Sequence, residues 1–343
     1  MADPVTFFSE VRTLMGWNQL VTLTDSSGGI LELGGGSSVL RVTNYQIGIN
    51  QTGEAPDYVT GRQDRTAWRK GPIESQGDLS FPFVLGDTGG GTGIALFKAA
   101  ANLVYNPGEN FTITSSVHPT LRGCKVNTAT IECQAGSEIT SRAQVWGIVT
   151  DEDLANINSF GDTERKLFPD ASPDGNSDDG GWADGAAVAG NVELSLEQIP
   201  MWDVVKIEGA PEGMFVVGFS LTVDNRLVRN YTMGNNEDEE YSPFGLNAQS
   251  ISANQRMING SITWQSNKAG GIQQIAAVGL NSLKITIGVP GSGITPIVLD
   301  MPQCLWNATP PSLAPGDRVT VESSFTALGE NNAEFDALII TTS

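Results

Sequence analysis

Residue types that several classes of enzyme and membrane protein require are scarce in this chain. No acidic or nucleophilic partner is suggested near the single histidine, His118, which argues against Ser-His-Asp and Cys-His catalysis. No apolar run approaches the roughly 20 residues of a membrane-spanning helix. The N-terminus lacks the basic-then-apolar layout of a secretory signal. We therefore expect a soluble protein made in the cytoplasm, without membrane insertion.

Cysteine is also rare. Cys124, Cys133 and Cys304 are too few and too scattered for a disulfide framework, and with one histidine they make no plausible zinc site. Buried free thiols are the simpler interpretation. An inter-subunit bridge through Cys124 and Cys304 is the alternative.

No motif for a metal ion or cofactor is complete. Asp174, Asn176 and Asp178 alternate as in a calcium-binding loop, but Asp179 and Gly185 stand where that loop needs its glycine and its last carboxylate. The glycine-rich stretch before residue 93 lacks the lysine of a phosphate-binding loop. We expect no catalytic site, no metal, no cofactor and no enzymatic activity.

Basic residues are few. Nineteen lysines and arginines stand against 39 acidic residues, a net charge of −20, which argues against neutralising the phosphates of a tightly bound nucleic acid. Nucleic acid remains possible as a repelled passenger. The hydrophobic content of 39% is enough to build a core.

Two-residue periodicity predicts strands through most of the chain. Apolar residues alternate with polar ones along 44–52, 76–83 and 142–149. One helix is expected over Gly93 to Tyr105, which Pro107-Gly108 would end. The fold class expected is mainly β (α+β).

The second half repeats the order of the first. The paired segments begin at Asn44 and Phe219, Gln76 and Asn259, Gly93 and Gly271, Cys124 and Cys304, and Gly136 and Gly316. Their offsets are 219 − 44 = 175, 259 − 76 = 183, 271 − 93 = 178, 304 − 124 = 180 and 316 − 136 = 180. A nearly constant offset indicates tandem duplication into two similar domains.

Between the copies, residues 151–190 hold ten acidic residues and many Gly, Pro, Ser and Asn, a composition typical of a linker or long surface insertion. The expected organisation is an N-terminal arm at 1–29, a first domain at 30–150, an acidic linker or insertion at 151–204 and a second domain at 205–343.

The repeated unit resembles the tail tube fold of tailed bacteriophages. The passage from Val59 to Phe83, a Gly- and charge-rich loop that runs into an alternating strand, is similar to the loop-then-strand passage of those proteins. The resemblance implies two tandem domains, each an antiparallel sheet or half-barrel with one packed helix and a long loop.

The same resemblance implies a structural virion protein of the tail, assembled in the host cytoplasm. Three chains with two domains each would form a pseudo-hexameric ring, closed into a β-barrel across subunits, and stacked rings would form the tube that conducts DNA during ejection. Implied partners are other copies of the chain, the tail sheath or other tail proteins, a tape measure protein in the lumen and genomic DNA as a transient passenger.

Charge differs between the long loops of the two copies. The first loop carries Arg62, Arg65, Arg69 and Lys70, and the second carries Glu237, Asp238, Glu239 and Glu240. Complementary charges of this kind can fix register between subunits or between rings; two solvated loops are the alternative. Asp78 and Asp224, polar positions on the matched strands, are the candidate lumen-facing residues.

Two other functions fit the same sequence. A baseplate hub or distal tail adaptor ring would use the duplicated domain in fewer copies. A two-domain β-sandwich that binds or hydrolyses carbohydrate would explain the β-rich, acidic composition without any assembly.

Overall fold

The computed structural model describes the strands and the turns between many of them. The described residues are 20–25, 37–54, 69–83, 85, 92–102, 111–115, 121–148, 200–209, 214–231, 248, 250–266, 280–288, 296–308, 320–329 and 336–342. These residues are mostly in antiparallel strands, which confirms the mainly β fold.

The first half of the chain contributes seven strands and the α-helix of the described residues. Its elements are β1 (Leu20–Asp25), β2 (Ser37–Arg41), β3 (Asn44–Glu54), β4 (Arg69–Pro82), α2 (Thr92–Asn102), β5 (Phe111–Ser115), β6 (Leu121–Gln134) and β7 (Thr140–Ile148). The helix falls inside the predicted range of residues 93–105, apart from its first residue.

The second half contributes nine strands and a short 3-10 helix, η2. Its elements are η2 (Trp202–Val204), β8 (Val205–Glu208), β9 (Met214–Asp224), β10 (Val228–Asn230), β11 (Ser250–Ser252), β12 (Met257–Ser266), β13 (Leu280–Ile287), β14 (Ile297–Ala308), β15 (Thr320–Ala327) and β16 (Ile339–Thr342). The helix predicted to start at Gly271 lies outside the described residues up to 279, and its last two positions begin β13.

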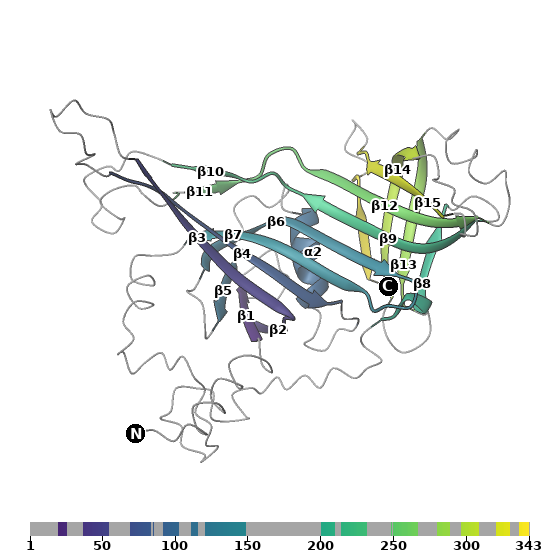
Figure 1. Ribbon diagram of the computed structural model, residues 1–343, viewed down its shortest axis with the longest axis horizontal. Coiled ribbons are helices and arrows are strands. Elements are labelled where there is room, and N and C mark those ends of the chain that lie inside the picture. The colour runs from purple at the N-terminus through teal and green to yellow at the C-terminus, as the bar shows by residue number, and fades with distance from the viewer. Residues whose placement is uncertain are drawn as a thin grey trace, which may run out of the picture.

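One 14-stranded sheet unites the two halves. Strand β6 pairs with β7 along one edge, and along the other it pairs with β5 near its start and with β9 near its end. The order across the middle of the molecule is therefore β3-β4-β7-β6-β9-β12-β15, with β14 beyond (Figure 1). Within the described strands this sheet is open and does not close into a barrel in one chain.

The strand order shows the internal repeat. Strands β3, β4, β7 and β6 lie side by side in the first half, and β9, β12, β15 and β14 follow in the same order in the second. A glycine lies at the equivalent position of β4 and β12, the second strand of each set. Gly77 of β4 pairs with Ile47 and Val145, and Gly260 of β12 pairs with Leu221 and Phe325. The offsets are 260 − 77 = 183, 221 − 47 = 174 and 325 − 145 = 180.

The offsets of 183 and 180 equal those of the sequence comparison, whereas the offset of 174 between β3 and β9 is one residue smaller than the 175 of that comparison. The sequence match of Asn44 with Phe219 gives 175, whereas the ladders match Tyr45 with Phe219. The residue matters because a one-residue slip exchanges the two faces of a strand. With the corrected offset, the buried aromatic side chains of Tyr45 and Phe219 occupy equivalent positions.

The same bulge interrupts β6 and β14. Leu121 and Cys124 on β6 face Ile113 and Phe111 on β5, so three steps along one strand oppose two along the other. Met301 and Cys304 on β14 repeat this against Leu283 and Asn281 on β13. Each bulge bends its strand, which lets β6 pass from β5 to β9.

The core lies on one side of the sheet, and helix α2 covers its first-half part. The helix is buried at Ile94–Phe97 and at Ala99–Ala101, and it contacts β6, β7, β9 and β2. An apolar surface around most of a helix requires burial on several sides. Most apolar side chains of the strands therefore point to this side, and most of their polar side chains point to the other.

A two-stranded ribbon extends the hairpin of β9 and β12. After β9, Asn225 is fully buried and donates to the carbonyl oxygens of Ala100 at 2.9 Å and Val126 at 3.0 Å. Arg226 follows with φ of 46°, a left-handed conformation that turns the chain. Strands β10 and β11 then form the ribbon, which lies by the first half (Figure 1). We call it the β10–β11 arm.

The predicted domain boundaries stay predictions, because residues 151–199 lie outside the described residues. Two described features bear on them. Strand β1 starts within the predicted arm and pairs with β2 and β5. Residues 200–202 are tied to the turn between β6 and β7, where Ile139 N donates to Pro200 O at 3.2 Å.

Candidate functional site

The outward side of the sheet is mostly polar. Antiparallel partners point their side chains to the same side, so the ladders define its rows. One row runs Gln46, Asp78, Gln144, Thr128, Asp224; the next runs Asn44, Ser80, Arg142, Thr130, Thr222, Asn259, Thr326; a third runs Thr140, Glu132, Ser220, Ser261, Ser324. We call this surface the polar face.

Asp78 and Asp224, the candidate lumen-facing residues, both lie on the polar face and in the same row. Asp78 is exposed, while Asp224 is half-buried and accepts a hydrogen bond from Arg226 N at 3.0 Å. The structure therefore brings onto one surface two residues that are distant in sequence. Their role as channel-lining groups stays a prediction.

Hydrogen bonds link neighbouring strands across the polar face. Asn127 donates to Gln144 Oε1 at 2.8 Å, and Gln144 in turn donates to Asp78 Oδ1 at 3.2 Å. The hydroxyls of Thr130 and Thr222 lie 2.9 Å apart across the junction of β6 and β9. These groups, all uncharged except the Asp78 carboxylate, link the strands without placing a cation on this part of the surface.

Carboxylates dominate the middle of the polar face. Asp78, Glu132, Asp224 and Glu322 stand against Arg142 and against Arg226, whose Nε lies 3.9 Å from Asp224 Oδ2. Arg142 and Glu322 occupy equivalent positions in the two halves, because 322 − 142 = 180 and the flanking pairs match. A position that carries a cation in one copy thus carries an anion in the other.

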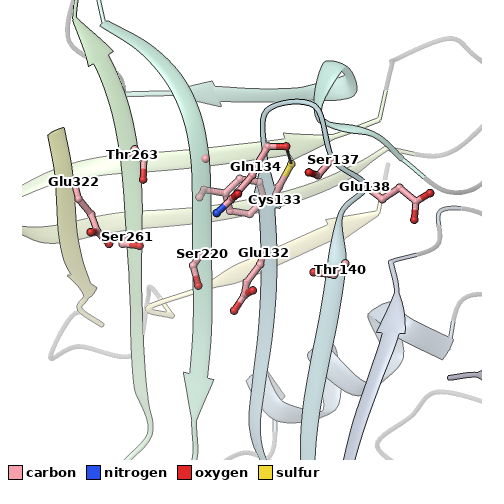
Figure 2. A pocket seen from close by; sticks show the side chains of 12 residues that line it. Glu132, Cys133, Gln134, Ser137, Glu138, Thr140, Ser220, Ser261, Thr263 and Glu322 are labelled. Carbon is pink, nitrogen blue, oxygen red and sulfur yellow. Dashed lines mark hydrogen bonds between the residues drawn. The ribbon is translucent and has the colours of Figure 1, made fainter. Parts of the chain in front are cut away.

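A shallow hollow of about 490 Å³ lies over the middle strands of this surface. Figure 2 shows Glu322 on β15, Thr263 on β12, Ser220 on β9 and Glu132 on β6 along its floor. Hydroxyls, amides and carboxylates make up most of its lining, together with Cys133 and Phe219.

The end of the polar face near Trp146 is different. The guanidinium of Arg229, on β10, lies 4.0 Å from the centre of the Trp146 ring and donates to Ser75 O at 2.6 Å. A cation over an aromatic face contributes roughly 0.5–2 kcal/mol. Burial lowers the pKa of Arg229, and the charge of Glu74 opposes that shift. The β10–β11 arm is therefore fastened to the first half.

Most of the predicted charged loop residues lie outside the described residues. Arg62, Arg65, Glu237, Asp238, Glu239 and Glu240 are among them. The backbone of Arg69 and Lys70 is described at the start of β4, opposite Glu54 and Gly53. The contact role of both loops stays a prediction.

The two candidate inter-subunit thiols are inside the core. Cys124 and Cys304 are fully buried, and each donates to the carbonyl oxygen three residues earlier, Leu121 O at 3.2 Å and Met301 O at 3.9 Å. Burial raises the pKa of Cys304 to about 12 and that of Cys133 to about 11. This environment favours buried free thiols, and the inter-subunit bridge stays a prediction.

Within the part of the chain that the structure describes, no cluster of three or more His, Cys, Asp or Glu residues could hold a metal ion. His118 and the calcium-like residues 174–178 fall outside that part. The described residues also include no helix long and apolar enough to cross a bilayer.

Several residues of the polar face were not predicted from the sequence. Glu132, Arg142 and Glu322 lie at polar positions of alternating strands, a signal visible once the strand register is known. Arg229 gives no such signal, because its contact with Trp146 joins residues of different halves.

A family model described as phage tail tube protein matches residues 24–335. The match spans both copies of the repeat and the segment between them. No curated protein matches the chain.

Proposed function

The chain belongs to the phage tail tube protein family, a structural family of the virion tail, and from this we propose that it is the repeating subunit of the tube. In this proposal three chains form a pseudo-hexameric ring, rings stack into a hollow tube, and DNA passes through the tube during ejection. The observation that carries the proposal is the polar face of seven strands, in which no described strand pairs with the outer edge of β3.

The junction of β6 and β9 supports the ring. The two halves meet there edge to edge through an antiparallel ladder from Thr128 and Asp224 to Gln134 and Gly218. Strands β3 and β9 are equivalent in the two halves. The edge of β3 that no described strand pairs with therefore corresponds to the edge of β9 that pairs with β6. An unpaired strand edge is an aggregation liability, and head-to-tail closure of chains removes it.

The charge of the polar face supports its role as the channel wall. Asp78, Glu132, Asp224 and Glu322 would repel the phosphates of passing DNA, whereas a wall of lysine and arginine would bind nucleic acid without regard to sequence. The tube would then act passively, as a rigid conduit. Proposed partners are the tail sheath or other tail proteins outside and a tape measure protein inside.

Electron microscopy of the purified protein tests the assembly. Tubes support the tube subunit, isolated rings indicate a hub or adaptor ring, and monomers at all concentrations contradict both. In assembled tubes, changing Asp78, Asp224 and Glu322 together to Lys should create salt-sensitive binding of short DNA duplexes that the wild-type tube lacks. Unchanged DNA binding by that variant would contradict the channel-wall assignment.

A further inference from the structure

The second half carries an exposed apolar patch whose counterpart in the first half lies beside the β10–β11 arm. The patch consists of the exposed Leu305 and Leu328 and the half-buried Met257, on the polar face around Thr326. Leu305 is 53% exposed and Leu328 is 37% exposed. Exposed apolar side chains that gather at one place mark an interaction surface.

The ladders identify the counterpart of this patch. Lys125 pairs with Trp146 as Leu305 pairs with Thr326, and 305 − 125 and 326 − 146 both equal 180. Lys125 is only 6% exposed, against 53% for Leu305 at the equivalent position. Beside it, Arg229 of the arm lies over the Trp146 ring. The β10–β11 arm thus lies beside this position in the first half, whereas the equivalent position in the second half is exposed to solvent.

The first half has its own version of the arm. Val228 of β10 pairs with Ser252 of β11. With the repeat offsets of 174 for β3 and β9 and 183 for β4 and β12, the equivalent residues in the first half are Glu54 (228 − 174) and Arg69 (252 − 183). These two residues pair at the distal end of the β3–β4 hairpin. The distal β3–β4 hairpin therefore corresponds to the arm, although it continues its strands without a separate ribbon.

This hairpin cannot reach the patch of its own chain. Strands β4, β7, β6, β9 and β12 separate β3 from β15, and strands about 4.8 Å apart place the two roughly 25–30 Å from each other. Only the β3–β4 hairpin of another copy can occupy the patch as the arm occupies its counterpart.

We infer that the distal β3–β4 hairpin of one chain packs over the Met257–Leu305–Leu328 patch of a second copy of the chain. The inference rests on the proposed ring and adds which surfaces meet at the boundary between chains. The contact of the β10–β11 arm with the first half of its own chain is then the intramolecular equivalent of this contact between chains.

The boundary between chains cannot copy the internal junction completely. Thr130 and Ile131 of β6 pair with Thr222 and Leu221 of β9, and the positions 180 residues later are Pro310 and Pro311. Proline has no backbone N–H to donate to a ladder. Side-chain contacts, including those of the apolar patch, must therefore contribute a larger share of the stability of the boundary between chains than of the internal junction.

Engineered cysteine pairs test where the copies meet. Thr128 and Asp224 are directly opposed at the internal junction, and the equivalent pair across chains is Ala308 and Asn50, since 308 − 128 = 180 and 224 − 50 = 174. Under mild oxidation, Asn50→Cys/Ala308→Cys should give cross-linked dimers and trimers on a non-reducing gel. Thr128→Cys/Asp224→Cys should cross-link within one chain, and the wild type should give no ladder.

Acidic substitutions then test the patch itself. Leu305→Glu/Leu328→Glu in the cross-linking background should lower the yield of cross-linked species roughly tenfold or more, because a charge would be buried in an apolar contact. Ile339→Glu, with the same chemical change at a residue that is also 37% exposed, should leave it unchanged. Urea unfolding checks that each variant folds.

The outcomes separate this inference from the proposed function. Tubes of wild-type appearance and full cross-linking in Leu305→Glu/Leu328→Glu would overturn the inference and leave the tube function standing. A wild-type chain that never forms rings or tubes would overturn the proposed function itself.

Discussion

The two halves of the chain keep the same buried face and differ on the polar face. Beneath the sheet, Leu121 and Cys124 correspond to Met301 and Cys304, and all four are buried. On the polar face, Arg142 corresponds to Glu322. Core packing constrains volume and apolarity at each position, whereas solvent-facing positions are free to change charge. The fold is therefore repeated, and the surface is specialised.

Reversing the charge of one long loop gives the largest effect that we expect. Changing Glu237, Asp238, Glu239 and Glu240 to Lys should block tube formation and leave the monomer folded, because like charges would face the basic loop of the first half. Electron microscopy and size-exclusion chromatography measure both. Combining this change with Arg62, Arg65, Arg69 and Lys70 to Glu should restore assembly. Normal tubes from the single reversal would show that the loops are only solvated.

Removing the amide of Asn225 tests the turn that directs the arm of the second half. Asn225→Ala leaves the carbonyl oxygens of Ala100 and Val126 without this buried donor, at a cost of about 2–4 kcal/mol in the free energy of unfolding. Urea denaturation measures the change. Asn254→Ala, at an exposed position, should change stability by less than about 0.5 kcal/mol. Equal changes in the free energy of unfolding of the two variants would contradict the stabilising role of the buried Asn225 amide.

The paired glycines provide a comparison between the halves at one position. A Cβ on Gly260 would lie 2.3 Å from Phe325 Cζ and 2.6 Å from Ser220 O, whereas one on Gly77 would lie 3.2 Å from Leu121 Cδ1. We expect Gly260→Ala to destabilise the fold by about 1–3 kcal/mol and Gly77→Ala by less. Gly48→Ala, with only Gln76 Cγ at 3.8 Å, is the control. Thermal unfolding in the reverse order would contradict the packing argument.

The alternation of apolar and polar residues predicted the strands and the repeat because periodicity and spacing are local signals. It assigned Asp78 and Asp224 to polar strand positions, but it could not show that the two lie in one row, since that depends on β6 pairing with β9. Repeat alignment also missed the first offset by one residue, which only the ladders of Gly77 and Gly260 fix.

Other features depend on contacts for which the sequence has no pattern. The fastening of Arg229 over Trp146 joins residues that are far apart in the chain. The burial of Cys124 and Cys304 follows from a bulge in β6 and in β14, and a bulge appears only once both strands are paired.

The joining of β6 to β9 within one polypeptide has a kinetic consequence for the proposed assembly. In the proposed ring, every second junction between neighbouring repeat units would form within one chain during folding, at the high effective concentration that a covalent connection provides. The formation of these junctions would not depend on the concentration of the protein. The proposed ring would recruit three molecules in place of six, so its formation should depend less steeply on protein concentration than that of a ring built from single-unit subunits.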